Sequence, residues 1–174
     1  MPPKTCAILS RGPSLAKYEA QEYDAIIGVN NVVEKWACDW WAFADWDQFV
    51  KTKPIGTPKI FTRVRTLDKL RHFAPDHVEL FKAVNATTDI AAAIPLIDKQ
   101  APFYNWSGPL ALGLAYMLGA DQVDCYGCDM GGNEDAFGHK NNGRNAWRWA
   151  EEKKIWARLE QLIAARGGCV RRIA

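Results

Sequence analysis

Short polar segments that follow apolar runs are the places where this chain could do chemistry. The first is "SRGPSL", residues 10–15, which comes directly after "CAIL". A glycine lets a ligand approach the backbone, and Ser14 as a helix N-cap would leave free N–H groups at the positive end of the helix. Phosphate suits such a turn, with Arg11 either paired with it or solvated. The alternative is an ordinary strand exit.

Two further segments place polar side chains after apolar runs. "IIGVNN" ends in Asn30 and Asn31, whose amides can both donate to and accept from a base or ribose, or can cap the following helix. "FADWDQF" carries Asp45 and Asp47, spaced to hold a metal ion or orient a sugar hydroxyl. Helix capping by Asp47 is the competing interpretation.

"NWSGPLALGLAYMLGADQVDCYGCDMGG" combines structural and functional signals. Ser107 and Gly108 open a helix rich in small residues, which can pack closely against a sheet. The strand that follows leads to Asp129, at the same edge where the other polar segments are expected. Cys125 and Cys128 form C-x-x-C across the strand end, without the second cysteine pair of a zinc site or the helix start of a redox site.

"MGGNEDAFGHKNNGR", residues 130–144, has the polar, glycine-bearing composition of a loop over a site. It carries His139 just ahead of a long predicted helix. A histidine in such a loop is a candidate general base, although a lone histidine is more often structural.

The elements that must position these residues alternate between short apolar runs and segments of helical period. The predicted strands span residues 6–10, 25–29, 40–44, 59–62, 78–81, 123–126 and 169–173, and the predicted helices span 14–23, 30–37, 67–73, 107–118 and 144–165. We therefore predict one α/β domain over residues 1–174, with a doubly wound, mostly parallel sheet and helices on both faces.

Composition limits the partners. The net charge of +2 gives no global case for nucleic acid, and no apolar stretch has the length of a signal peptide or membrane span, so we expect a cytoplasmic protein. The five cysteines suit free thiols in a reducing compartment. An exposed subset of the eight tryptophans would favour a homo-oligomer.

The order of "GPSL", "IGVN", "SG", "GCD" and "GH" resembles two related families over about residues 6–173. They are the bacterial lipooligosaccharide sialyltransferases, which use a cytidine monophosphate donor, and the 6-hydroxymethylpterin diphosphokinase-like proteins. The resemblance implies a Rossmann-like fold in which Gly12, Pro13 and Ser14 line the phosphate, and Asn30 or Asn31 the nucleotide. It also assigns Ser107, Gly108 and Asp129 to the pocket and His139 to the base.

These expectations support three hypotheses. The first is a nucleotide-sugar-dependent, sialyltransferase-like glycosyltransferase, in which His139 is the base and no metal or other cofactor is required. The second is a diphosphokinase-like transfer from ATP, with Mg²⁺ held by Asp45, Asp47 or Asp129 and without a P-loop. The third is a non-catalytic nucleotide-binding module, for example a bacteriophage protein that sequesters a host nucleotide.

Overall fold

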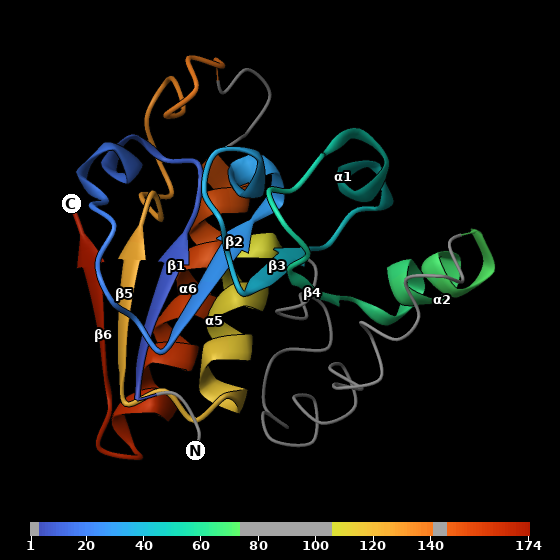
Figure 1. Cartoon of the computed structure of the whole chain (residues 1–174). Helices are drawn as coiled ribbons and strands as arrows, with labels where there is room; N and C mark the ends of the chain where they lie inside the picture. Colours follow the sequence, from blue (N-terminus) through green and yellow to red (C-terminus); the bar gives the residue numbers. More distant parts are fainter. Residues whose placement is uncertain (1–3, 74–105, 141–145) are drawn as a thin grey trace.

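The computed structural model describes residues 4–73, 106–140 and 146–174 (Figure 1). Its strands are β1 (Thr5–Leu9), β2 (Ala25–Val29), β3 (Trp40–Phe43), β4 (Lys59–Thr62), β5 (Gln122–Tyr126) and β6 (Cys169–Ile173). Its helices are α1 (Trp46–Lys51), α2 (Val64–Phe73), α5 (Ser107–Met117) and α6 (Ala146–Ala164), and two short 3-10 helices are η1 (Pro13–Lys17) and η2 (Asn30–Glu34).

The six strands form one parallel sheet in the order β4-β3-β2-β1-β5-β6. This confirms the predicted α/β class and is consistent with a Rossmann-like fold. The six predicted strands that lie in the described part of the chain each match within one residue at either end. The predicted strand at residues 78–81 lies outside the described residues.

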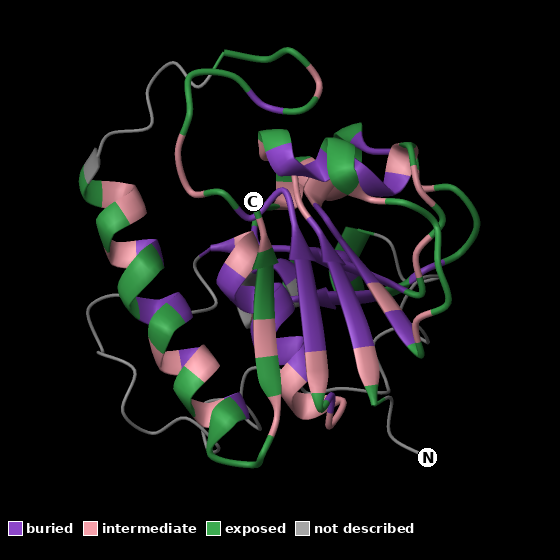
Figure 2. Ribbon diagram, turned by 90° about the vertical axis from the view of Figure 1, so that its left-hand side faces the viewer, coloured by how far each residue is buried: buried purple, intermediate pink, exposed green. Residues whose placement is uncertain are grey.

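Helices cover the two faces unequally. Cys6 and Ile8 of β1 point to the face on which α5 and α6 pack, while Ala7 and Leu9 point to the other face. On that second face, η1 and η2 pack near the carboxyl edge (Figures 1 and 2), and the buried Leu70 of α2 packs with residues of β3 and β4. The strands nearest the centre are buried on both sides, which explains their continuous apolar sequences.

The order of the strands reverses between β1 and β5. Strands β1 to β4 follow one another in one direction, and α5 then returns the chain across the sheet to place β5 on the other side of β1. Beyond the strands, Ser10 N–H donates to the carbonyl of Tyr126 (2.8 Å) and Gly12 N–H to that of Gly127 (2.7 Å). The two loops are therefore joined at the carboxyl edge.

Two predicted helices are shorter than expected. The helix predicted at 14–23 is only η1, because Tyr18 is extended and Tyr23 is drawn to β5, where its hydroxyl donates to Asp124 (3.0 Å). The helix predicted at 30–37 is only η2, because Asp39 must return to the sheet to accept from Ile26 N–H (2.8 Å). Helix α1 was not predicted, since its six residues are too few to show a period.

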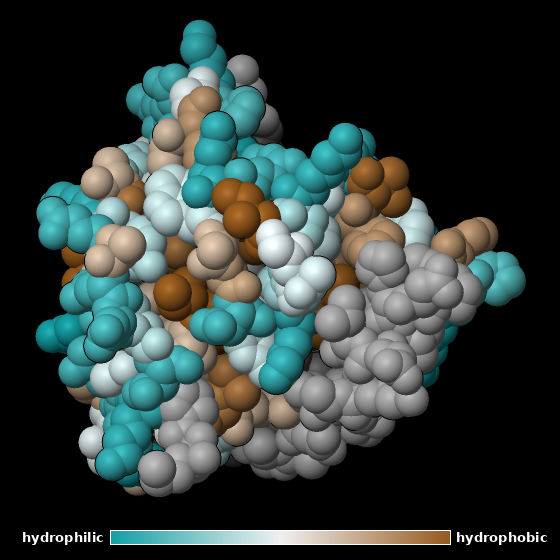
Figure 3. Space-filling view, viewed as in Figure 1, coloured by the Kyte–Doolittle hydropathy of each residue, from teal (hydrophilic) through white to brown (hydrophobic). Residues whose placement is uncertain are grey.

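The surface offers no large apolar feature in the view of Figure 3, where hydrophobic residues are scattered among hydrophilic ones over the described elements. No helix in residues 4–73, 106–140 and 146–174 combines the length and the apolar character needed to cross a membrane.

Candidate functional site

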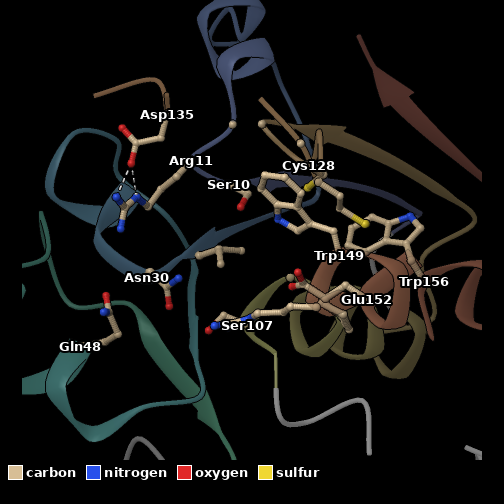
Figure 4. Close-up of a pocket in the computed structure, with 18 of the residues that line it drawn as sticks. Ser10, Arg11, Asn30, Gln48, Ser107, Cys128, Asp135, Trp149, Glu152 and Trp156 are labelled. Atoms are coloured by element: carbon tan, nitrogen blue, oxygen red, sulfur yellow. Dashed lines mark hydrogen bonds and ion pairs between the residues drawn. The ribbon is translucent and has the colours of Figure 1, made fainter. Parts of the chain in front are cut away.

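A cavity of about 350 Å³ lies at the carboxyl edge of the sheet, where the loops after β1, β2, β3 and β5 meet the first turns of α5 and α6 (Figure 4). Polar groups predominate among the residues that line it. Six of the predicted site residues are on its wall: Arg11, Gly12, Asn30, Asp45, Ser107 and Gly108. The predicted convergence of separate polar segments at one edge is thus present in the structure.

Pro13, Ser14, Asn31, Asp129 and His139 do not line the cavity. Ser14 is not an N-cap: it is the second residue of η1, its N–H donates to Asp129 Oδ2 (3.1 Å), and its Oγ accepts from Gly127 N–H (2.9 Å). The donors expected to face a phosphate therefore join the β1 and β5 loops instead. Asp129 contributes to this contact by accepting the hydrogen bond from Ser14 N–H.

The close contact between the two loops depends on glycine. A Cβ added to Gly12 would lie 2.0 Å from Asp129 Oδ2, and one added to Gly127 would lie 2.1 Å from the carbonyl oxygen of Ser10. Gly127 also has a φ of +68°, which other residues rarely adopt. Glycine at these two positions therefore allows the backbones of the β1 and β5 loops to lie in close contact.

Asn30 is held in an unusual conformation beside the cavity. Its φ is +54°, and its carbonyl accepts a hydrogen bond from Trp41 Nε1 (2.8 Å). Its side-chain Oδ1 is buried and has no hydrogen-bond partner within the described residues. Since a buried acceptor without a donor is costly, this atom is suited to receive a hydrogen bond from a ligand.

Arg11 is paired with a carboxylate that the sequence analysis did not identify. The guanidinium donates to Asp135 Oδ2 through Nε (2.9 Å) and through Nη2. Burial alone would raise the pKa of Asp135, but the bonds from Arg11 and from the N–H groups of His139 and Phe137 outweigh it and lower that pKa. Ala136 N–H also donates to the carbonyl of Arg11 (2.7 Å), so this contact fastens the 134–140 loop over the site.

His139 lies beside this ion pair, with 3.5 Å between Arg11 Nη2 and His139 Nδ1. Its Nδ1 is 3.3 Å from Asp135 Oδ1, and its side chain is 62% exposed. The structure therefore brings His139 to a carboxylate that lines the cavity without placing the imidazole on the cavity wall.

The first turn of α5 opens into the cavity. Ser107 and Gly108 precede Pro109, which has no N–H, and the first N–H of this turn with a backbone partner is that of Leu110, which donates to Trp106 (3.0 Å). Within the part of the chain that the structure describes, the N–H groups of Ser107 and Gly108 therefore have no hydrogen-bond partner, and they lie at the positive end of an 11-residue helix. Ser107 Oγ accepts from Ala44 N–H (3.1 Å), which fixes this turn to the β3 exit.

The predicted acidic residues do not converge. Asp45 pairs with Arg63 (2.8 Å) and Asp47 with Lys51 (2.9 Å), whereas Asp129 is bound to the η1 backbone. Within the described parts of the chain, no group of three or more His, Cys, Asp or Glu side chains is arranged to hold a metal ion. Cys125 and Cys128 are both buried free thiols, and Cys128 lines the cavity.

Several cavity residues come from segments that the sequence analysis treated as structural. Gln48 lies in α1, which was not predicted, and Trp149 and Glu152 lie on α6, for which only a helix was predicted. Glu152 is 7% exposed, which is unusual for a charged residue. The sequence could have indicated these residues, because they lie near the start of a helix and the first turns of that helix reach the carboxyl edge.

Comparison with known proteins gives no match to this chain among protein-family models, curated proteins or solved structures.

Proposed function

We propose that the cavity binds a nucleotide-sugar and that the protein is a glycosyltransferase-like enzyme that transfers the sugar to an acceptor hydroxyl. The observation that carries this proposal is the polar cavity beside the β1–β5 reversal of strand order. Open α/β sheets bind ligands at this point, outside the carboxyl ends of the strands. The cavity volume of about 350 Å³ is in the range of small-molecule sites.

The charges and donors of the cavity support a phosphate-bearing ligand. The free N–H groups of Ser107 and Gly108 and the guanidinium of Arg11 would contact the phosphate, in place of the η1 turn. Asn30 Oδ1 would accept from a hydroxyl or amino group of the nucleotide. A cytidine nucleotide-sugar is the first donor to test, given the sequence resemblance.

The transfer step assigned to this site needs a base. In it, His139 Nε2 takes the proton of the acceptor hydroxyl, the acceptor oxygen bonds to the anomeric carbon, and the bond from that carbon to the phosphate oxygen breaks. Asp135 would hold Nδ1–H of His139 and leave Nε2 available. Arg11 would stabilise the departing nucleoside phosphate.

A second candidate is nucleotide binding without catalysis. The observation that favours it is the exposed position of His139, outside the cavity wall. This function needs the cavity and its phosphate contacts but no base.

Binding is tested by calorimetric titration with CMP, UDP, GDP, ADP and their sugar conjugates, each with and without Mg²⁺. We expect a metal-independent complex that Asn30→Gly weakens about tenfold, which corresponds to the loss of about one hydrogen bond. Glycine tolerates the φ of +54° at this position, so the variant removes the side chain without straining the backbone. Asn31 Oδ1 is also buried without a partner among the described residues, but Asn31 does not line the cavity, so Asn31→Ala is the control and should bind normally.

Turnover separates the two candidates. With a donor that binds, His139→Ala should abolish sugar transfer while leaving the affinity for the donor unchanged. His72→Ala, which alters an exposed histidine on α2, is the control. Binding without product in the wild type would support the non-catalytic module, and no binding to any nucleotide would refute both candidates.

A further inference from the structure

Trp149 differs from the other tryptophan on the same face of α6. Trp156, seven residues later, is 1% exposed, and its indole N–H donates to Glu160 Oε1 (2.9 Å). Trp149 is half-buried and lines the cavity, where Figure 4 shows its indole between Ser10 and Trp156. Both tryptophans line the cavity, but Trp156 is almost fully buried in the core, while Trp149 leaves part of its ring exposed.

Among the residues that the structure describes, no hydrogen bond, ring–ring contact or cation–π contact involves the ring of Trp149. By contrast, Trp36 and Trp41 pack against aromatic rings, and Trp40 lies under Lys59 Nζ at 5.3 Å from its centroid. Leaving part of an indole exposed in a polar cavity forgoes burial of a large apolar area. An aromatic face of this kind suits a planar ring of a ligand, since every nucleobase has a complementary π-face.

Arg148 and Glu152 of α6 line the cavity beside Trp149, but the polar groups assigned above to the phosphate and to the polar atoms of the nucleotide lie on other elements. Arg11 and Asn30 follow β1 and β2, and Ser107 begins α5, whereas Trp149 belongs to α6. A ligand with a charged end and a flat apolar end therefore has separate contacts for each. A nucleotide has this form, with its phosphate at one end and its base at the other.

We propose that Trp149 is the stacking surface for the nucleobase in this cavity. The proposal rests on the function proposed above and adds to it the residue that binds the base. It requires that Trp149 contributes to the affinity for nucleotides and contributes nothing to the affinity for a sugar phosphate without a base.

The test compares two kinds of probe by calorimetric titration. The four ribonucleoside monophosphates AMP, CMP, GMP and UMP carry a base, and ribose 5-phosphate does not. We expect Trp149→Ala to weaken binding of the best nucleoside monophosphate about 10- to 100-fold, as for loss of one base–aromatic stack. The affinity for ribose 5-phosphate should stay the same, and Trp149→Phe, which keeps a smaller ring, should restore part of the nucleotide affinity.

Trp147→Ala is the matched control, because Trp147 lies on the same helix, is 65% exposed and does not line the cavity. Unfolding curves of all variants show whether each is folded. Unchanged nucleotide affinity in Trp149→Ala would overturn the stacking role and leave the proposed function intact. An equal loss for ribose 5-phosphate would overturn it as well, by showing a general disturbance of the cavity. If no nucleoside monophosphate binds the wild type, both proposals fail.

Discussion

At the scale of single residues, Gly127 has two requirements that no other side chain meets. Its φ of +68° costs an alanine about 1–2 kcal/mol, and the contact with Ser10 adds an overpacking cost of about 1–3 kcal/mol. We expect Gly127→Ala to lower the free energy of unfolding by about 3 kcal/mol or more. Urea unfolding followed by circular dichroism measures this loss.

Gly56→Ala separates the two costs of Gly127. Gly56 has a similar φ of +73°, but a Cβ there would meet no heavy atom within 4 Å. Its substitution should therefore cost only the backbone strain, about 1–2 kcal/mol. Equal losses in the two variants would mean that the approach of the β1 and β5 loops is not tight.

Sequence reasoning identified most of the polar residues at the carboxyl edge of the sheet but not the contacts between them. Arg11 and Asn30 were found because each follows a strand that ends at the carboxyl edge, and Ser107 because it begins a helix that starts there. The pairing of Arg11 with Asp135 spans 124 residues of sequence, and no local pattern indicates it. Likewise, no local pattern indicates that Ser14 N–H donates to Asp129, which is 115 residues away in the sequence.

At the scale of elements, the edge strand β6 depends on a buried carboxylate. Asp124 of β5 is 2% exposed, and its oxygens accept from Arg171 Nε and Nη2 of β6, each at 2.6 Å. Hydrogen bonds to charged groups contribute about 1.5–3 kcal/mol, less where solvent screens them, as at the half-exposed Arg171. We expect Asp124→Asn to lower the free energy of unfolding by about 2 kcal/mol and to speed amide exchange in β6.

The control for this variant is an exposed ion pair. Asp47 and Lys51 lie 2.9 Å apart on α1, and both side chains are more than two-thirds exposed. Asp47→Asn should change the free energy of unfolding by less than about 0.5 kcal/mol. If Asp124→Asn were as mild, β6 would be held by its backbone pairing with β5 and not by Arg171.

The strands were predictable and the covering helices were less so, for a physical reason. A strand buried on both faces is largely apolar, which marks β1 and β2 in the sequence and also β5, where Asp124 is the buried exception. The ends of η1 and η2 are set instead by tertiary contacts of Tyr23 and Asp39. Local helical propensity continues past these ends, so it predicts helices that are too long.

At the scale of the whole molecule, doubly wound topology explains why the cavity lies where it does. The chain enters the sheet at β1, moves outward to β4, and returns through α5 to β5. This return places the start of α5 at the carboxyl edge, near loops from the first half of the chain. Ser14 N–H of the short η1 donates to Asp129. The backbone N–H groups that face the cavity therefore come from Ser107 and Gly108 in the first turn of α5.

The pH dependence of stability follows from two carboxyl groups, Asp124 of β5 and Asp135 of the loop that follows β5. Burial alone would raise their pKa values, but Arg171 and Tyr23 lower the pKa of Asp124, and Arg11 and two backbone N–H groups lower that of Asp135. The unfolded chain therefore takes up these protons at a higher pH than the folded one. Their contribution to stability is complete above the usual pKa of 3.8 and is lost as the pH falls through the lowered values of the folded state.

Wild type and Asp124→Asn should therefore differ in a pH-dependent way. Above about pH 5, the variant should be less stable by about 2 kcal/mol, since the wild-type carboxylate is ionised there. As the pH falls below about 4, protonation removes the same charge from the wild type, so the two free energies of unfolding should converge. Urea unfolding at a series of pH values measures the gap. A gap that stays constant down to about pH 2 would mean that the shape of the side chain, and not its charge, stabilises β6.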